Sequence, residues 1–179
     1  PVTVFLGLAA TISPMLFARV GTRPVLVTGA LLAAAGIYYL SRVPVHGHYL
    51  QDLFPGLVLM ALGLGSIIVA ATVAANAGVP AKQAGLAAGL INTSAQLGTA
   101  LGLAIFSALA TARSNHLFAA HAARPDALTS GYGRALLASS IFLGGAALIA
   151  LRTTNSRGEE PQEQLDAELA FASLRTFES

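Results

Sequence analysis

The sequence places two side-chain amides and several small residues on one face of an expected helix. Gly85, Gly89, Asn92, Gln96 and Thr99 follow one another at steps of four, three, four and three residues. This spacing puts them in one narrow stripe of an α-helix. An amide left in hydrocarbon costs several kcal/mol, so the stripe must face protein or a water-filled cavity. Two roles remain open for the amides: hydrogen bonds between packed helices, or the lining of a transport path.

A second candidate for such a path is Ser66, which lies on another expected helix. It forms a row of small residues, at steps of three, four, four and three, with Gly63, Ala70, Ala74 and Ala77. Such a row predicts close packing against a neighbouring helix. The Ser66 hydroxyl has two possible roles, because it can bond to its own helix backbone or line a path.

The glycine spacing also predicts close helix packing. Gly85 and Gly89 are four residues apart, and so are Gly98 and Gly102 on a different face of the same helix. Pairs of small residues at this spacing let the backbones of membrane helices approach each other. We therefore interpret both pairs, together with Gly63, as packing positions.

Groups that could perform covalent or metal chemistry do not assemble in this sequence. The expected spans carry no Asp, Glu, Lys, Arg or His away from their ends, and the chain has no cysteine. His46 and His48 could share a metal, but two histidines in an interfacial loop are far more often solvated. We expect no catalytic residue, no metal site and no cofactor in this chain.

The elements that position these residues are apolar runs. Hydrophobic residues make up 55% of the 179 residues and charged residues only 10%, against about a quarter charged in an average domain. Runs of about 18 or more apolar residues span bilayers. The expected spans are 2–18, 25–40, 53–77, 84–112 and 135–151. The sequence therefore predicts an all-α membrane protein with five transmembrane helices.

Between and beyond these spans lie polar segments. Residues 113–133 are expected to form an extramembrane loop or a short interfacial helix. Residues 158–179 change abruptly to an acidic composition, which predicts a soluble tail after a membrane bundle over 1–157. Gly21 suits a tight reversal between the first two spans.

The basic residues divide between the two ends of the expected bundle. One end carries Arg19, Arg23, Lys82, Arg152 and Arg157, and the other carries Arg42, Arg113, Arg124 and Arg134. Five against four does not set the orientation by the positive-inside rule. Basic residues at the ends of apolar runs, without a cluster interleaved with aromatics, argue against nucleic-acid binding.

Two stretches carry a family resemblance. Residues 55–65 open a long glycine-containing helix, and residues 84–102 combine glycines with Asn-Thr and Gln-Leu-Gly. Together they resemble the last spans of the fourteen-helix drug:proton antiporter branch of the major facilitator superfamily. Residues 13–24 are similar to the degenerate C-terminal copy of the superfamily's cytoplasmic loop motif, without its usual acid. Its matching positions here are Arg19, Gly21 and Arg23.

The resemblance covers residues 1–157 and implies helices ten to fourteen, which form most of a C-terminal bundle. It implies a multi-pass protein of the cell membrane with a cytoplasmic tail. The implied partners are membrane lipid, the N-terminal helices of the same protein and a small hydrophobic substrate. The proton-carrying acids are implied to lie in the N-terminal bundle.

The implied function is proton-coupled efflux of drugs or other hydrophobic compounds by alternating access. Two other functions remain open from the residues themselves. One is a non-transporting assembly or scaffold subunit with glycine-rich faces. The other is the membrane anchor of an enzyme whose active residues lie elsewhere.

Overall fold

A computed structural model describes residues 2–45, 47–76 and 79–152, and in this part of the chain all the regular structure is helical. The expected all-α fold is confirmed. The predicted acidic tail lies outside the described residues. The elements are α1 Val2–Val20, α2 Thr22–Leu40, the π-helical turn η1 Tyr49–Leu53, α3 Phe54–Asn76, the 3-10 turn η2 Ala81–Gln83, α4 Ala84–Ala119 and α5 Arg124–Ala150.

Several helices are long and apolar enough to cross a membrane. In the described part of the chain these are the segments Thr22–Leu40, Tyr49–Asn76, Ala84–Ala119 and Arg124–Ala150, and the apolar segment Val2–Leu16 is shorter. Large apolar side chains also point outward, as Leu86 and Met15 do with 75% and 73% of their surface exposed. Lipid is the solvent that such surfaces require.

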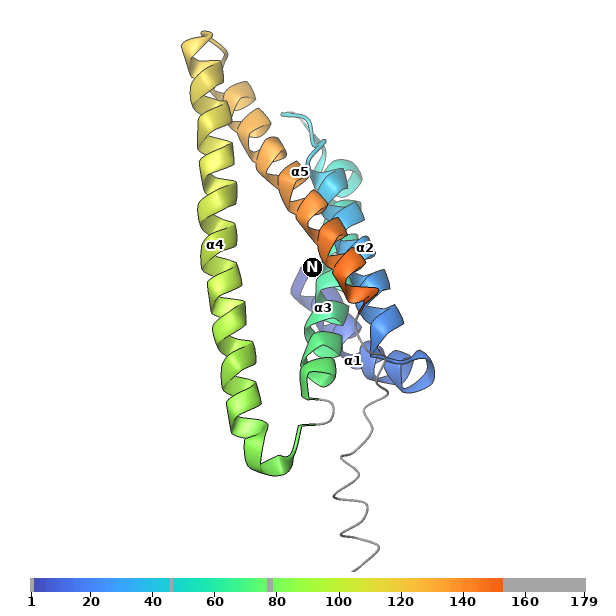
Figure 1. Ribbon diagram of the computed structural model, residues 1–179. Helices are drawn as coiled ribbons and strands as arrows, with labels where there is room; N and C mark the ends of the chain where they lie inside the picture. Colours follow the sequence, from blue (N-terminus) through green and yellow to red (C-terminus); the bar gives the residue numbers. More distant parts are fainter. Residues whose placement is uncertain (1, 46, 77–78, 153–179) are drawn as a thin grey trace, which may run out of the picture.

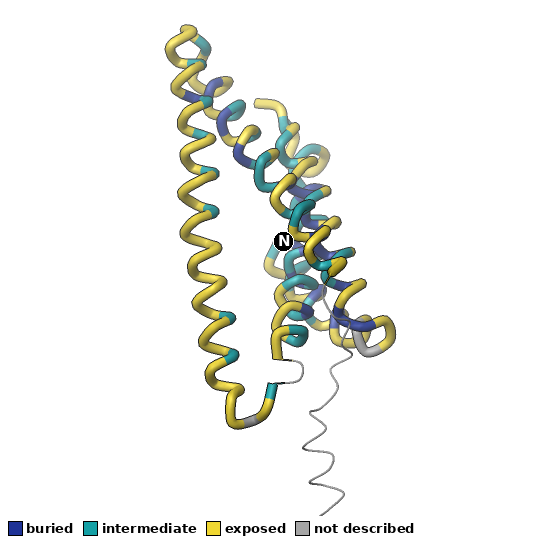
Figure 2. The backbone as a smooth tube through the Cα atoms, viewed as in Figure 1, coloured by how far each residue is buried: buried dark blue, intermediate teal, exposed yellow. Residues whose placement is uncertain are grey.

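The helices do not pack in chain order. Helix α3 lies against both α1 and α2, α2 also lies against α5, and α5 lies against α4 (Figure 1). Figure 2 shows the buried positions gathered on the first three helices and α5, whereas α4 is exposed along most of its length. Helix α4 therefore has two halves, and among the described residues only its C-terminal half packs against α5.

Glycines set the distance between α2 and α3. A Cβ on Gly63 would lie 2.5 Å from the carbonyl oxygen of Gly29 and 2.8 Å from the Cα of Ala33. Two helical turns further on, a Cβ on Gly36 would lie 2.8 Å from the carbonyl oxygen of Gly56. Real Cβ contacts are longer, so the two backbones touch because these positions lack side chains.

Helix α1 covers the other side of α3. A Cβ on Gly65 would lie 2.8 Å from the Cβ of Ala9, so a glycine again allows the close approach. The rings of Phe5 and Phe54 meet edge to face with their centroids 6.0 Å apart. Pro14 lies inside α1, where it donates no backbone hydrogen bond.

The link between α1 and α2 is a single residue. Gly21 has φ 91° and ψ 167°, a left-handed conformation that glycine adopts without strain, as the expected reversal requires. Helix α1 includes Arg19 and α2 includes Arg23. The two arginines of the expected cytoplasmic loop motif therefore belong to the ends of the two helices.

Residues 113–133 form neither of the two expected structures, a loop or a separate short helix. Helix α4 continues to Ala119, and α5 begins at Arg124. The polar residues from Arg113 onward indicate where the chain leaves the hydrocarbon, but without glycine or proline they do not end the helix. Pro125 is the second residue of α5, where its missing N–H is not needed by the helix.

A four-residue turn joins α4 to α5. The backbone N–H of Ala122 donates to the carbonyl of Leu117, and that of His121 donates to the carbonyl of Phe118, both at 3.0 Å. These two bonds form a Schellman motif, which satisfies carbonyls at the end of a helix. His121 has φ 58°, so a histidine occupies the position that glycine usually fills.

Candidate functional site on the fourth helix

The two amides of the predicted stripe lie in the half of α4 that stands apart from the bundle. Asn92 and Gln96 are exposed within this chain. The hydroxyl of Thr99, the third polar member, donates to the carbonyl of Ala95 at 2.8 Å. The structure thus brings the three polar residues onto one surface and places no other helix of the described chain against it.

The direction of the stripe follows from the rest of α4. Continued at helical steps of four, three, four and four residues, it reaches Leu103, Phe106, Ala110 and Ser114. All four line a cavity of about 410 Å³ between α4 and α5. The amides therefore lie on the side of α4 that packs against α5 higher up.

Another side of α4 is aliphatic instead of polar. Four leucines recur there at steps of four, seven and four residues, and 60% to 75% of each side chain is exposed. They are Leu86, Leu90, Leu97 and Leu101. Helix α4 is therefore two-sided, with an aliphatic surface suited to lipid and a polar stripe turned toward the bundle.

The contact between α4 and α5 holds the stripe in this direction. The buried hydroxyl of Ser114 donates to the carbonyl of Ala127 at 3.2 Å. A Cβ on Gly131 would lie 2.6 Å from the carbonyl oxygen of Ala110, so this glycine brings the two backbones together. The rings of Phe106 and Phe142 meet edge to face at 5.9 Å between centroids.

Ser66 lies at a different place in the bundle. Its half-buried side chain faces α2, where its Cβ is 3.2 Å from the position of a Cβ on Gly29. Its hydroxyl donates to the carbonyl of Leu62 at 2.9 Å. Ser66 and the amides of α4 are thus not brought together, whereas Ser66 and Gly63 share the packed face of α3.

The glycines of α4 contact no other helix of the described chain. A Cβ added at Gly85, Gly89 or Gly98 would meet no atom within 4 Å, and one at Gly102 would meet only Phe106 of the same helix, 3.6 Å away. The expected packing role of these positions remains a prediction.

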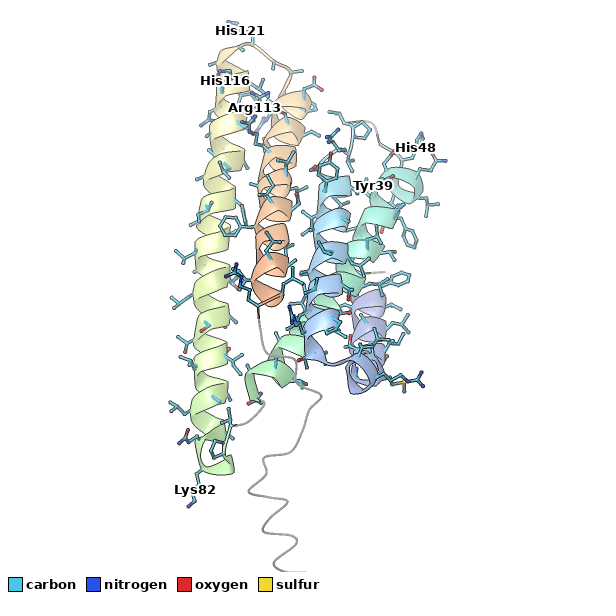
Figure 3. The ribbon with its side chains drawn as sticks, turned by 45° about the vertical axis from the view of Figure 1, so that its right-hand side comes forward. Tyr39, His48, Lys82, Arg113, His116 and His121 are labelled. Carbon is cyan, nitrogen blue, oxygen red and sulfur yellow. The ribbon has the colours of Figure 1, made fainter. Side chains whose placement is uncertain are left out.

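The two ends of the bundle differ in their polar residues. Figure 3 shows His48, Arg113, His116 and His121 toward one end and Lys82 at the opposite end. At the first end the hydroxyl of Tyr39 donates to the carbonyl of Gln51 at 3.0 Å. Within the described residues no group of three or more His, Cys, Asp or Glu could hold a metal, and His46 lies outside them.

Sequence reasoning missed most of the contact glycines. Gly29 and Gly36 on α2, Gly56 on α3 and Gly131 on α5 all lie where another helix touches the backbone. A signal was present, because both Gly29/Gly36 and Gly56/Gly63 are seven residues apart, which is about two helical turns. Their pairing across the two helices required the structure.

These features define a polytopic α-helical membrane protein whose helices pack through glycines and which carries a polar stripe on the side of α4 that packs against α5. Comparison with known proteins adds the family. The model of the Major Facilitator Superfamily matches residues 2–177, and the chain belongs to this family.

Several curated relatives are similar to this chain. A puromycin resistance protein of Streptomyces alboniger is 35% identical over 132 residues, 72% of this chain and 26% of the relative. A cephamycin export protein of Amycolatopsis lactamdurans is 27% identical, over 82% of this chain and 29% of the relative. A tetracenomycin C resistance and export protein of Streptomyces glaucescens is 32% identical, over 66% and 22%. The chain thus spans about a quarter of the length of these relatives.

Proposed function

We propose that the protein containing this chain is a secondary transporter that exports hydrophobic compounds, coupled to protons, by alternating access. The observation that carries this proposal is the family match over residues 2–177, together with relatives named as resistance or export proteins. In this proposal the chain performs no catalysis and needs no cofactor.

The chain supplies most of the C-terminal bundle in this proposal. The exposed inward side of α4 supports it, because a polar stripe without a partner in the described chain needs protein or water beside it. In this proposal the N-terminal helices of the same protein lie beside the polar stripe. The protein lies in the cell membrane with the end that carries Lys82 in the cytoplasm. The test fuses after Lys82 a reporter that works only outside the cell, and activity of this reporter would contradict the orientation.

The residues proposed to line the path are Asn92, Gln96 and Thr99. They share the inward side of α4, and an amide there can bond to a polar group of a substrate or to water. Ser66 contributes less to this proposal, since its hydroxyl is bonded within α3 and its side chain faces α2.

The test uses Asn92→Leu and Gln96→Leu in the intact protein. Both variants are expected to remain folded in the membrane at nearly the unsubstituted level while the set of exported compounds changes. Leu90→Asn and Leu97→Asn, on the aliphatic side, are expected to lower the folded amount instead, since an amide there faces lipid. Unchanged efflux together with a loss of folded protein in the Asn92 and Gln96 variants would assign these amides to helix packing.

A further inference from the structure

Two cavities adjoin each other at the end of the bundle that carries His48 and His121. One, the basic cavity, measures about 390 Å³, lies between the end of α2, α4 and α5, and has Arg42, Arg113 and Arg134 in its wall. The other, the apolar cavity, measures about 260 Å³ and is lined mainly by Leu40, Leu53, Tyr132 and Leu136. The two share Ser41, Val43, Thr129 and Gly133, so they meet at a common wall.

The charges in the basic cavity are not balanced. Arg113 is half-buried, and its Nε donates to the hydroxyl of Ser130 at 3.3 Å (its position is shown in Figure 3). Arg42 lies over the ring of Tyr38, with its guanidinium carbon 5.0 Å from the ring centroid. Both partners are neutral, so neither cancels a positive charge.

Among the described residues that line the cavity, Asp126 is the one acid. Three arginines against one carboxylate leave a formal excess of two positive charges. Guanidinium groups have planar sets of donors that match phosphate oxygens. The hydroxyl-bearing residues Ser41, Thr129 and Ser130 line the same cavity. The basic cavity therefore suits a phosphate group.

The neighbouring apolar cavity identifies the kind of phosphate. A free inorganic anion would use only the basic cavity, whereas a phospholipid has a phosphate and an acyl chain joined at a short distance. Tyr38 and Tyr39 lie at this end of α2, and aromatic residues are enriched where membrane helices reach the membrane–water interface. Lipid headgroups lie at that interface.

We propose that this end of the bundle binds an anionic phospholipid, with its phosphate in the basic cavity and the first part of an acyl chain in the apolar cavity. A zwitterionic lipid fits less well, because its ammonium group would lie among three arginines. The inference does not depend on what the protein transports.

The test measures lipid binding to the intact, delipidated protein in detergent by native mass spectrometry. Phosphatidylglycerol is expected to bind more tightly than phosphatidylcholine with the same chains. Arg113→Gln and Arg134→Gln should each weaken phosphatidylglycerol binding about fivefold, the value of one basic residue at a charged membrane surface. Arg124→Gln is the matched control, because Arg124 lies near the same end but lines neither cavity.

Asp126→Asn is expected to change lipid binding in the opposite direction. It removes the negative charge from the basic cavity and should strengthen phosphatidylglycerol binding about fivefold. A loss of folded protein would not produce such an increase. Phosphatidylglycerol with very short chains should bind more weakly than the long-chain lipid. Three results would each overturn the proposal. The first is equal binding of the two headgroups, and the second is an equal effect of Arg124→Gln and the two cavity variants. The third is thermal stabilisation by inorganic phosphate as strong as that by the lipid.

Discussion

Gly36 of α2 and Gly56 of α3 face each other so closely that a Cβ on Gly36 would lie 2.8 Å from the carbonyl oxygen of Gly56 and 2.5 Å from the backbone nitrogen of Met60. Backbone atoms, unlike the ends of side chains, cannot move aside cheaply. The close approach of the two helices at this point therefore depends on the absence of a side chain at Gly36.

Gly36→Ala is expected to destabilise the bundle by about 1–3 kcal/mol, the usual cost of overpacking. The measurement is the thermal midpoint of the detergent-solubilised intact protein. Gly7→Ala in α1 is the control, because a Cβ there meets no atom within 4 Å and alanine favours a helix by about 1 kcal/mol over glycine. Equal midpoints for the two variants would contradict the close contact.

The pairing of α4 with α5 can be tested by a disulfide. A Cβ on Gly131 would lie 3.4 Å from the Cβ of Ser114, close to the roughly 3.5–4.5 Å of ordinary disulfides. The chain has no cysteine of its own. A Cβ on Gly131 would also lie 2.6 Å from the carbonyl oxygen of Ala110, so the two helices must separate slightly to accept it. We expect Ser114→Cys with Gly131→Cys still to cross-link under mild oxidation, detected as a bridged peptide by mass spectrometry.

The control pair is Ser107→Cys with Gly131→Cys. Ser107 lies two helical turns before Ser114 on the same side of α4, about 10 Å along the axis. No bridge is expected there. A bridge to position 107 but not to 114 would mean that the two helices pair in another register.

His121 occupies a left-handed position, with φ 58°. Left-handed backbone costs a residue with a side chain roughly 1–2 kcal/mol, and glycine avoids this cost. His121→Gly should therefore raise the thermal midpoint. His116→Gly, inside the last turns of α4, should lower it by about 1 kcal/mol in stability. The same sign of change in both variants would exclude the observed turn.

Single-cysteine labelling tests the direction of α4 in the intact protein. A polar thiol reagent is expected to label cysteines at 85, 89, 92, 96 and 99 and to spare those at 86, 90, 97 and 101, since the polar stripe faces water or protein and the leucines face lipid. Labelling that follows the Gly98 and Gly102 face would show that α4 is rotated relative to its proposed setting.

The sequence by itself determined the class of protein and the faces of its helices. Run length and the absence of charge identify membrane helices, because lipid excludes unsatisfied polar groups whatever the neighbours are. Helical periodicity placed Asn92, Gln96 and Thr99 on one side of α4 for the same local reason. The row containing Gly63 and Ser66 was likewise visible as a face.

Only the tertiary structure decided which face meets which helix. Lipid is as apolar as leucine, so hydrophobicity does not select partners, and packing depends on shape at positions such as Gly36, Gly56 and Gly131. The polar residues after Arg113 continue α4, where Ser114 packs against α5. The basic cavity brings together Arg42, Arg113 and Arg134. These residues are far apart in the chain, so their proximity appears only when α2, α4 and α5 are packed together.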